Sequence, residues 1–117
     1  MKYIITDEQI DRILKPFFEG TFKDAKLIEY DYEHAHDYED EIEDYTEGWV
    51  GFSLIKDGKR EVLLGRPSET QNKNEWFSNG EYFNGWWDMF NLELKDFNES
   101  MRRFVNEKYN MNIDKIF

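Results

Sequence analysis

The spacing of apolar residues predicts a helix near the start of the chain. Thr6 is a suitable N-cap, and Gln9 three residues later completes a capping-box pattern. Apolar residues follow at helical spacing and are expected to form a buried stripe: Ile10, Ile13, Leu14 and Phe17. Pro16 is expected to weaken the last turn of this helix, and Gly20 is expected to end it.

A second helix is predicted near the other end, over Leu94–Tyr109. One face is marked at helical spacing by Phe97, Met101, Phe104, Val105 and Lys108. Glu99 and Arg103, four residues apart, are placed to form an ion pair on another face. Asn110 is a suitable C-terminal cap, so the helix is expected to stop there.

Alternating patterns predict strands between the two helices. In Lys26–Tyr38, aromatic residues and histidines alternate mainly with acids, which is the pattern of a long strand with two different faces. Residues 39–47 remain acidic and are expected to form a loop or a short turn of helix. Trp49–Ile55 and Glu61–Leu64 are predicted strands, joined by a tight Asp-Gly turn within Lys56–Lys59.

The remaining segments are predicted to be turns and a small hairpin. Pro67–Glu75 contains no apolar side chain apart from its proline and is expected to be an exposed, mobile loop. Trp76–Phe83 resembles a second hairpin about Asn79-Gly80, with another turn at Asn84-Gly85. Together the elements predict one α+β domain over residues 1–117. Its antiparallel sheet of about four or five strands would be covered by the N-terminal and C-terminal helices.

Composition narrows the class of protein. Aromatic residues make up 18% of the 117 residues, far more than a disordered tail contains. The absence of cysteine excludes disulfides, thiol catalysis and Cys-ligated zinc. No apolar run is long enough to span a bilayer, and no secretory signal opens the chain. A cytoplasmic protein that needs no cofactor is therefore expected.

The formal net charge of −11 is concentrated in one segment. No Lys or Arg occurs between Lys26 and Lys56, while the rest of the chain carries 16 acids against 15 bases. The ten acids of this segment are Glu29, Asp31, Glu33, Asp37, Glu39, Asp40, Glu41, Glu43, Asp44 and Glu47. A local negative field disfavours direct binding to nucleic acid or to an anionic membrane, because both carry the same sign of charge.

This acidic segment has two competing interpretations. On an extended strand, carboxylates two residues apart are separated by roughly 6.6 Å, close to the spacing of phosphates along DNA. The segment would then bind a basic groove of a nucleic-acid-binding protein as a DNA mimic. Alternatively, the acids mark a solvated edge strand whose charges prevent edge-to-edge pairing. An EF-hand is excluded because residues 37–47 contain no glycine.

Two further groups of residues are candidate sites. His34 and His36 would share one face of a strand and are weak candidates for zinc ligands, although a third ligand would be needed. Seven aromatic residues fall between positions 76 and 90, and they are expected mainly to build the core. Since Trp86 and Trp87 are adjacent, only one is expected to point inward. The other would offer a surface for self-association or assembly.

The sequence does not indicate an enzyme. It contains no phosphate-binding glycine loop and no nucleophile elbow, and neither histidine lies in an acid–base motif. A metal-dependent enzyme at His34 and His36 is the third hypothesis, after a non-enzymatic acidic protein-binding domain and a self-associating structural protein. The identity of the partner and the oligomeric state are left open.

The opening residues Met1-Lys2-Tyr3-Ile4-Ile5-Thr6-Asp7-Glu8-Gln9 resemble the start of many small, uncharacterised acidic proteins of tailed phages. The general composition, rich in Lys, Asn, Ile and acids, is similar too. The resemblance implies a phage or phage-derived context and a bacterial cytoplasm, and it assigns no catalytic residue. Small acidic phage proteins include inhibitors that imitate DNA, which agrees with the charge pattern.

Overall fold

The computed structural model describes residues 6–38 and 41–117 and, within them, the side chains outside 32–46. Five strands form one sheet in the order β1-β2-β3-β4-β5. The elements are α1 (Asp7–Phe22), β1 (Lys26–Tyr38), β2 (Glu41–Lys56), β3 (Lys59–Pro67), β4 (Glu75–Ser78), α2 (Trp86–Met89), α3 (Leu94–Tyr109) and β5 (Lys115–Ile116). The first four strands pair antiparallel, and β5 adds to β4 in parallel. The predicted α+β fold is confirmed.

Helix α1 begins as the sequence predicts but ends later. The side-chain oxygen of Thr6 accepts a hydrogen bond from the backbone N–H of Gln9 at 3.2 Å, and the side-chain oxygen of Gln9 accepts one from the backbone N–H of Thr6 at 3.0 Å. The helix continues past Gly20, so the prediction that Gly20 ends it is wrong. Its buried residues recur every four positions: Ile10, Leu14, Phe18 and Phe22. Ile13 and Phe17, predicted to be buried, are instead 45% and 40% exposed.

Helix α3 and the Asp-Gly turn between β2 and β3 match the predictions. Phe97, Met101 and Val105 are buried, whereas Lys108, predicted on the same face, is exposed. Asn110 caps the helix in the left-handed conformation at φ 53°. The Asp-Gly turn between β2 and β3 also has both central residues at positive φ, which a two-residue turn of this kind requires.

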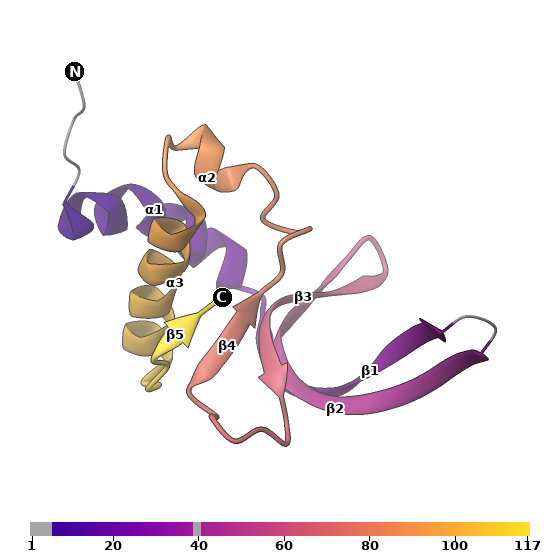
Figure 1. Ribbon diagram of the computed structural model, residues 1–117. Coiled ribbons are helices and arrows are strands. Elements are labelled where there is room, and N and C mark those ends of the chain that lie inside the picture. Colours follow the sequence, from indigo (N-terminus) through magenta and orange to yellow (C-terminus); the bar gives the residue numbers. More distant parts are fainter. Residues whose placement is uncertain (1–5, 39–40) are drawn as a thin grey trace.

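The core lies between the helices and one face of the sheet. Phe52 on β2 contacts Phe22 of α1, Trp76 of β4 and Tyr109 of α3, with ring centroids 4.8–6.2 Å apart. Helices α1 and α3 lie side by side and cover this face, while the C-terminal strand closes the far edge (Figure 1). Most of the aromatic cluster packs here, as predicted: Trp76 and Phe83 are buried, and Tyr82, Trp86, Trp87 and Phe90 pack against the core.

The hairpin predicted about Asn79-Gly80 does not form. Strand β4 stops at Ser78, and the chain then turns toward α2. The Oδ1 atom of Asn79 accepts hydrogen bonds from the amides of Glu81 and Tyr82, and its Nδ2 donates to the Val62 carbonyl at 2.7 Å. The asparagine therefore stabilises a turn anchored to β3, which replaces the second strand of a hairpin.

Among the described residues, no helix combines the length and the apolar character required to cross a membrane.

Candidate functional site

The acidic segment folds into a two-stranded ribbon. The residues expected to form a loop after Tyr38 are strand from Glu41 onward, so that prediction is wrong. Strand β1 pairs with β2 along its whole length, from Lys26 opposite Ser53 to Tyr38 opposite Glu41. Residues 42, 45 and 46 are Ile, Tyr and Thr, all good strand formers, and each is paired with a residue of β1.

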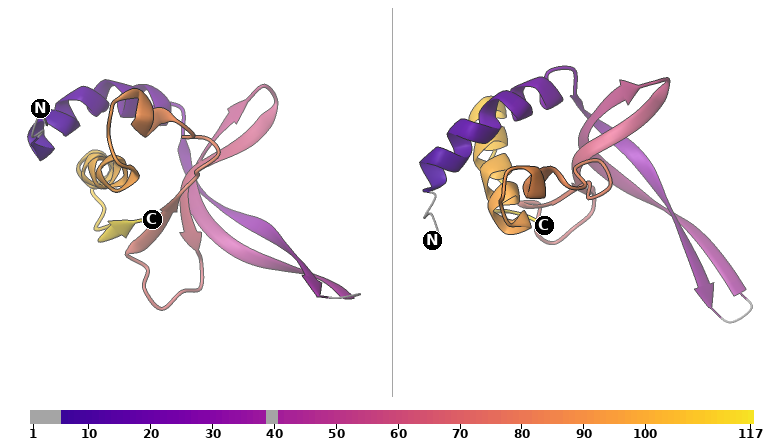
Figure 2. Two further views of the ribbon diagram at one scale, coloured as in Figure 1. Left: turned by 45° about the horizontal axis from the view of Figure 1, so that its top comes forward. Right: turned by 90° about the horizontal axis from the view of Figure 1, so that it is seen from above.

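The outer part of this ribbon leaves the globule. Strand β3 pairs with β2 only from Trp49 to Lys56, so beyond that point β1 and β2 have only each other. We call residues 31–38 and 41–48 the acidic arm. It extends away from the helices in every view (Figures 1 and 2), and the molecule measures 53 × 34 × 32 Å. The radius of gyration is 16.0 Å, against about 13 Å for a compact chain of this length.

The register separates the acids of the two strands. Asp31 lies opposite Gly48, Glu33 opposite Thr46, and Asp37 opposite Ile42. On β2 the acids are placed in the same way: Glu41 lies opposite Tyr38, Glu43 opposite His36, Asp44 opposite Ala35 and Glu47 opposite Tyr32. In the described strands, no acid is paired directly with another acid.

The acids predicted to form a single row are therefore divided between two antiparallel strands, whose backbones lie about 4.8 Å apart. Glu29 lies opposite Val50, two pairs closer to the globule than Asp31, and both acids have exposed side chains. Glu39 and Asp40 lie outside the described residues.

Aromatic side chains cross the sheet where the arm joins it. Tyr30 and Trp49 are paired across β1 and β2, and their ring centroids are 6.4 Å apart. Trp49 is 6.1 Å from Phe77 on β4, and Phe77 stacks on Phe117 at 5.4 Å. The indole N–H of Trp49 also donates a hydrogen bond to the carboxylate of Glu47, at 3.1 Å. This aromatic row connects the arm to the far edge of the sheet.

An open hollow of about 850 Å³ lies over this aromatic row. Tyr30, Trp49 and Phe77 line it, and Gly65 of β3 lies between them. A methyl group on Gly65 would come within 2.7 Å of the Tyr30 hydroxyl, so glycine is needed for the ring to lie over β3. Sequence reasoning missed this hollow because its residues come from four strands that no local pattern places together.

Trp86 and Trp87 occupy a different place from the predicted one. Both lie on α2 and are half-buried, so the prediction that one of them is exposed is wrong. Trp86 contacts Phe17 and Phe83, with centroids 6.3 and 5.2 Å away, and Trp87 contacts Phe97 at 6.3 Å. Their short helix packs both tryptophans against the core and leaves Asp88 and Met89 exposed.

His34 and His36 lie on β1, opposite Tyr45 and Glu43, and their side chains are outside the described part of the chain. Within the side chains that the structure describes, no three His, Cys, Asp or Glu residues are arranged to hold a metal ion.

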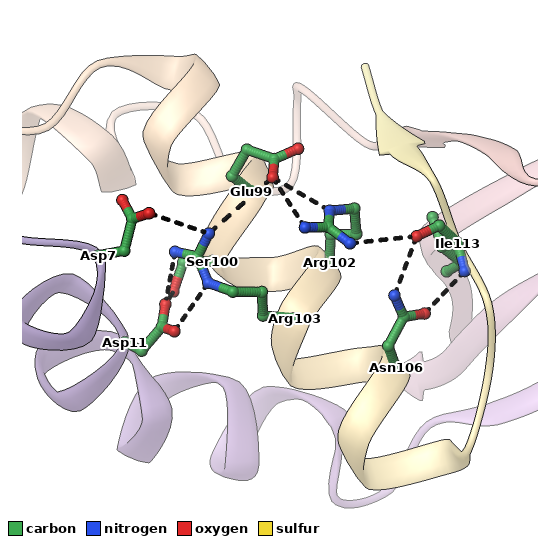
Figure 3. A network of polar contacts seen from close by, with 8 residues as sticks. All are labelled: Asp7, Asp11, Glu99, Ser100, Arg102, Arg103, Asn106 and Ile113. Carbon is green, nitrogen blue, oxygen red and sulfur yellow. Dashed lines mark hydrogen bonds and ion pairs between the residues drawn. The ribbon is translucent and has the colours of Figure 1, made fainter.

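A polar network joins the two long helices (Figure 3). Arg103 of α3 donates two hydrogen bonds to the Asp11 carboxylate of α1, each 2.8 Å long, and the Ser100 hydroxyl donates a third at 2.7 Å. Burial would raise the pKa of Asp11, but the hydrogen bonds from Arg103 and Ser100 outweigh it and lower that pKa. The predicted Glu99–Arg103 pair is present at 3.9 Å and is weaker than the contact to Asp11.

The Asp11–Arg103 network is structural. A hollow of about 330 Å³ beside it is lined by residues of α1 and α3. The Asp11 carboxylate accepts three hydrogen bonds from α3, and its lowered pKa keeps it charged at neutral pH, so it joins the two helices.

Comparisons with protein-family models, with curated proteins and with solved structures find no match to this chain.

Proposed function

We propose that this protein is a non-enzymatic binding domain that inserts its acidic arm into a basic groove of another protein. The observation that carries this proposal is the geometry of the arm. Acids concentrated in one segment of the sequence lie on two paired strands that project from a folded globule. An exposed solvated edge needs charge, but it does not need to extend beyond the sheet.

The charge sign defines the class of partner. The arm carries no Lys or Arg, so it attracts a positively charged surface and repels nucleic acid and anionic lipid. Basic grooves of this kind are typical of proteins that bind nucleic acid, and a projecting ribbon rich in acids would occupy such a groove in place of DNA. The phage resemblance of the N-terminus supports this role as an inhibitor of a bacterial nucleic-acid-binding protein.

The test compares three baits in a capture from bacterial extract at about 0.15 M salt. One is the native protein. The arm variant has Asp37, Glu39, Asp40, Glu41, Glu43 and Asp44 changed to Asn or Gln. The control variant has six exposed acids elsewhere changed in the same way: Glu19, Asp24, Glu69, Asp88, Glu107 and Asp114. Both variants therefore have the same net charge.

A basic nucleic-acid-binding protein retained by the native and control baits, and lost from the arm variant, is the expected result. Equal retention by all three baits, or equal loss from both variants, would mean that the position of the charge is irrelevant. The acidic segment would then be a solvated edge.

Self-association through Trp86 and Trp87 stays a prediction. Their half-buried position on α2 leaves less surface for it than the sequence suggested. Sedimentation equilibrium of the native protein tests it, because a concentration-dependent oligomer is required by that function and not by the acidic arm.

A further inference from the structure

The hollow at the base of the acidic arm combines three features of a cation site. Its floor is aromatic, with Trp49 half-buried and the Phe77 side chain 43% exposed. Two carboxylates line its sides, those of Glu61 and Glu81, against one positive charge from Arg60. The negative arm begins directly beside it, at the pair formed by Tyr30 and Trp49.

The chain itself places a cation on this aromatic row. The ammonium group of Lys115 lies 4.6 Å from the centroid of the Phe117 ring, which stacks on Phe77. A ring face attracts a cation through its quadrupole, and the attraction strengthens where nearby carboxylates add to the negative field. Lys115 thus supplies a cation to Phe117 at the far end of the row. In the hollow, a cation from another molecule could contact the neighbouring ring, Phe77.

We propose that this hollow binds an arginine side chain of the basic partner, while the arm contacts the charges around it. This inference rests on the proposed function and names the chemistry of its central contact. Arginine fits better than lysine because the guanidinium is planar, is weakly hydrated and stacks on aromatic rings. The hollow would then supply a preference for one type of residue, which the arm's charge alone does not.

The test uses two peptides, one of nine arginines and one of nine lysines. The affinity of each peptide for the intact protein is measured by calorimetric titration at about 0.15 M salt. The decisive variant is Phe77→Leu, which keeps an apolar side chain but removes the ring. Its matched control is Phe17→Leu, an exposed phenylalanine at 40% on helix α1. Thermal unfolding confirms that both variants are folded.

The native protein is expected to bind the arginine peptide more tightly than the lysine peptide. Phe77→Leu should lower the affinity for the arginine peptide by about threefold to tenfold and change the affinity for the lysine peptide less. Phe17→Leu should change neither. Equal affinity for both peptides, or no effect of Phe77→Leu, would overturn the inference.

The arm variant separates this inference from the proposed function. If it loses both peptides while Phe77→Leu binds as the native protein does, the arm functions and the hollow does not bind arginine. If the arm variant binds as tightly as the native protein, the proposed function fails, whatever Phe77→Leu shows.

Discussion

Two glycines explain how the aromatic residues of the sheet fit together. Gly51 on β2 is paired with Gly65 on β3, and the backbones approach closely there. A methyl group on Gly51 would lie 2.6 Å from the Leu64 carbonyl oxygen and 2.9 Å from the Cα of Gly65. Because both neighbours are backbone atoms, rotation of a side chain cannot relieve the contact.

We therefore expect Gly51→Ala to destabilise the protein by about 2 kcal/mol or more. Gly20→Ala is the matched control, since nothing lies within 4 Å of that position in α1. There the exchange should stabilise by about 0.5–1 kcal/mol, because alanine is the better helix former. Urea unfolding of both variants measures the difference, and a Gly51→Ala variant as stable as the native protein would refute the close contact.

The Asp11 carboxylate makes stability depend on pH. Its hydrogen bonds from Arg103 and Ser100 lower its pKa in the folded state. The folded protein thus holds this proton less tightly than the unfolded chain, so the stabilisation is present above about pH 4. It is lost as the pH falls through the lowered pKa of the folded state.

Asp11→Asn should cost about 1 kcal/mol at pH 7, a modest value because 37% of the Asp11 side chain is exposed and solvent screens the pair. The difference from the native protein should shrink as the pH is lowered below 4. The Asp7 carboxylate is 3.9 Å from Arg103 and its side chain is 81% exposed, so Asp7→Asn should lower the free energy of unfolding by only about a few tenths of a kcal/mol. Urea unfolding at pH 7 and pH 3 measures both, and an unchanged cost for Asp11→Asn at the two values would contradict this account.

At the scale of elements, the side chain of Asn106 anchors the segment that leads into the C-terminal strand. Asn106 of α3 accepts a hydrogen bond from the Ile113 amide at 2.8 Å and donates one to the Ile113 carbonyl at 2.9 Å (Figure 3). This pair of bonds mimics a backbone pairing and directs the chain toward β4. There the Phe117 amide donates to the Trp76 carbonyl, at 2.9 Å.

Asn106→Ala should release β5 from β4 without unfolding the rest of the sheet. The expected result is faster hydrogen exchange at the amides of residues 115–117, by about tenfold. Asn106→Asp, which keeps the acceptor and loses the donor, should have an intermediate effect. If exchange in this segment is unchanged in the alanine variant, the contacts between β4 and β5 suffice without Asn106.

Elements with local signals were predictable from the sequence. The capping box at Thr6, the Asp-Gly turn and the helix over Leu94–Tyr109 each depend on residues a few positions apart, and each is confirmed. The strand from Glu41 was missed because its pairing with β1 overrides the weak strand preference of an acidic run. The turn about Asn79-Gly80 was predicted as part of a hairpin, and the hairpin was wrong because the Asn79 side chain bonds to Val62 of β3, 17 residues away.

The same distinction applies to the candidate site. The concentration of acids between Lys26 and Lys56 can be read directly from the sequence. The hollow over Phe77 depends on four strands and on two glycines that let them approach, so only the assembled sheet reveals it.

At the scale of the whole molecule, the protein is a folded globule with one projection that is rich in acids. A two-stranded ribbon alone is marginally stable in water, and here its base is embedded in the sheet from Trp49 to Lys56. The aromatic core and the helices lie against one face of the sheet, and the arm projects away from them (Figures 1 and 2).

The measurement that tests this account most directly is the affinity of the captured partner for the native protein, the arm variant and the control variant at 50 and 200 mM salt. Many ion pairs along the arm predict that native affinity falls by about tenfold or more over that range. The control variant should follow the native protein, and the arm variant should bind weakly at both concentrations. An arm variant with the affinity and salt dependence of the control would contradict the central claim.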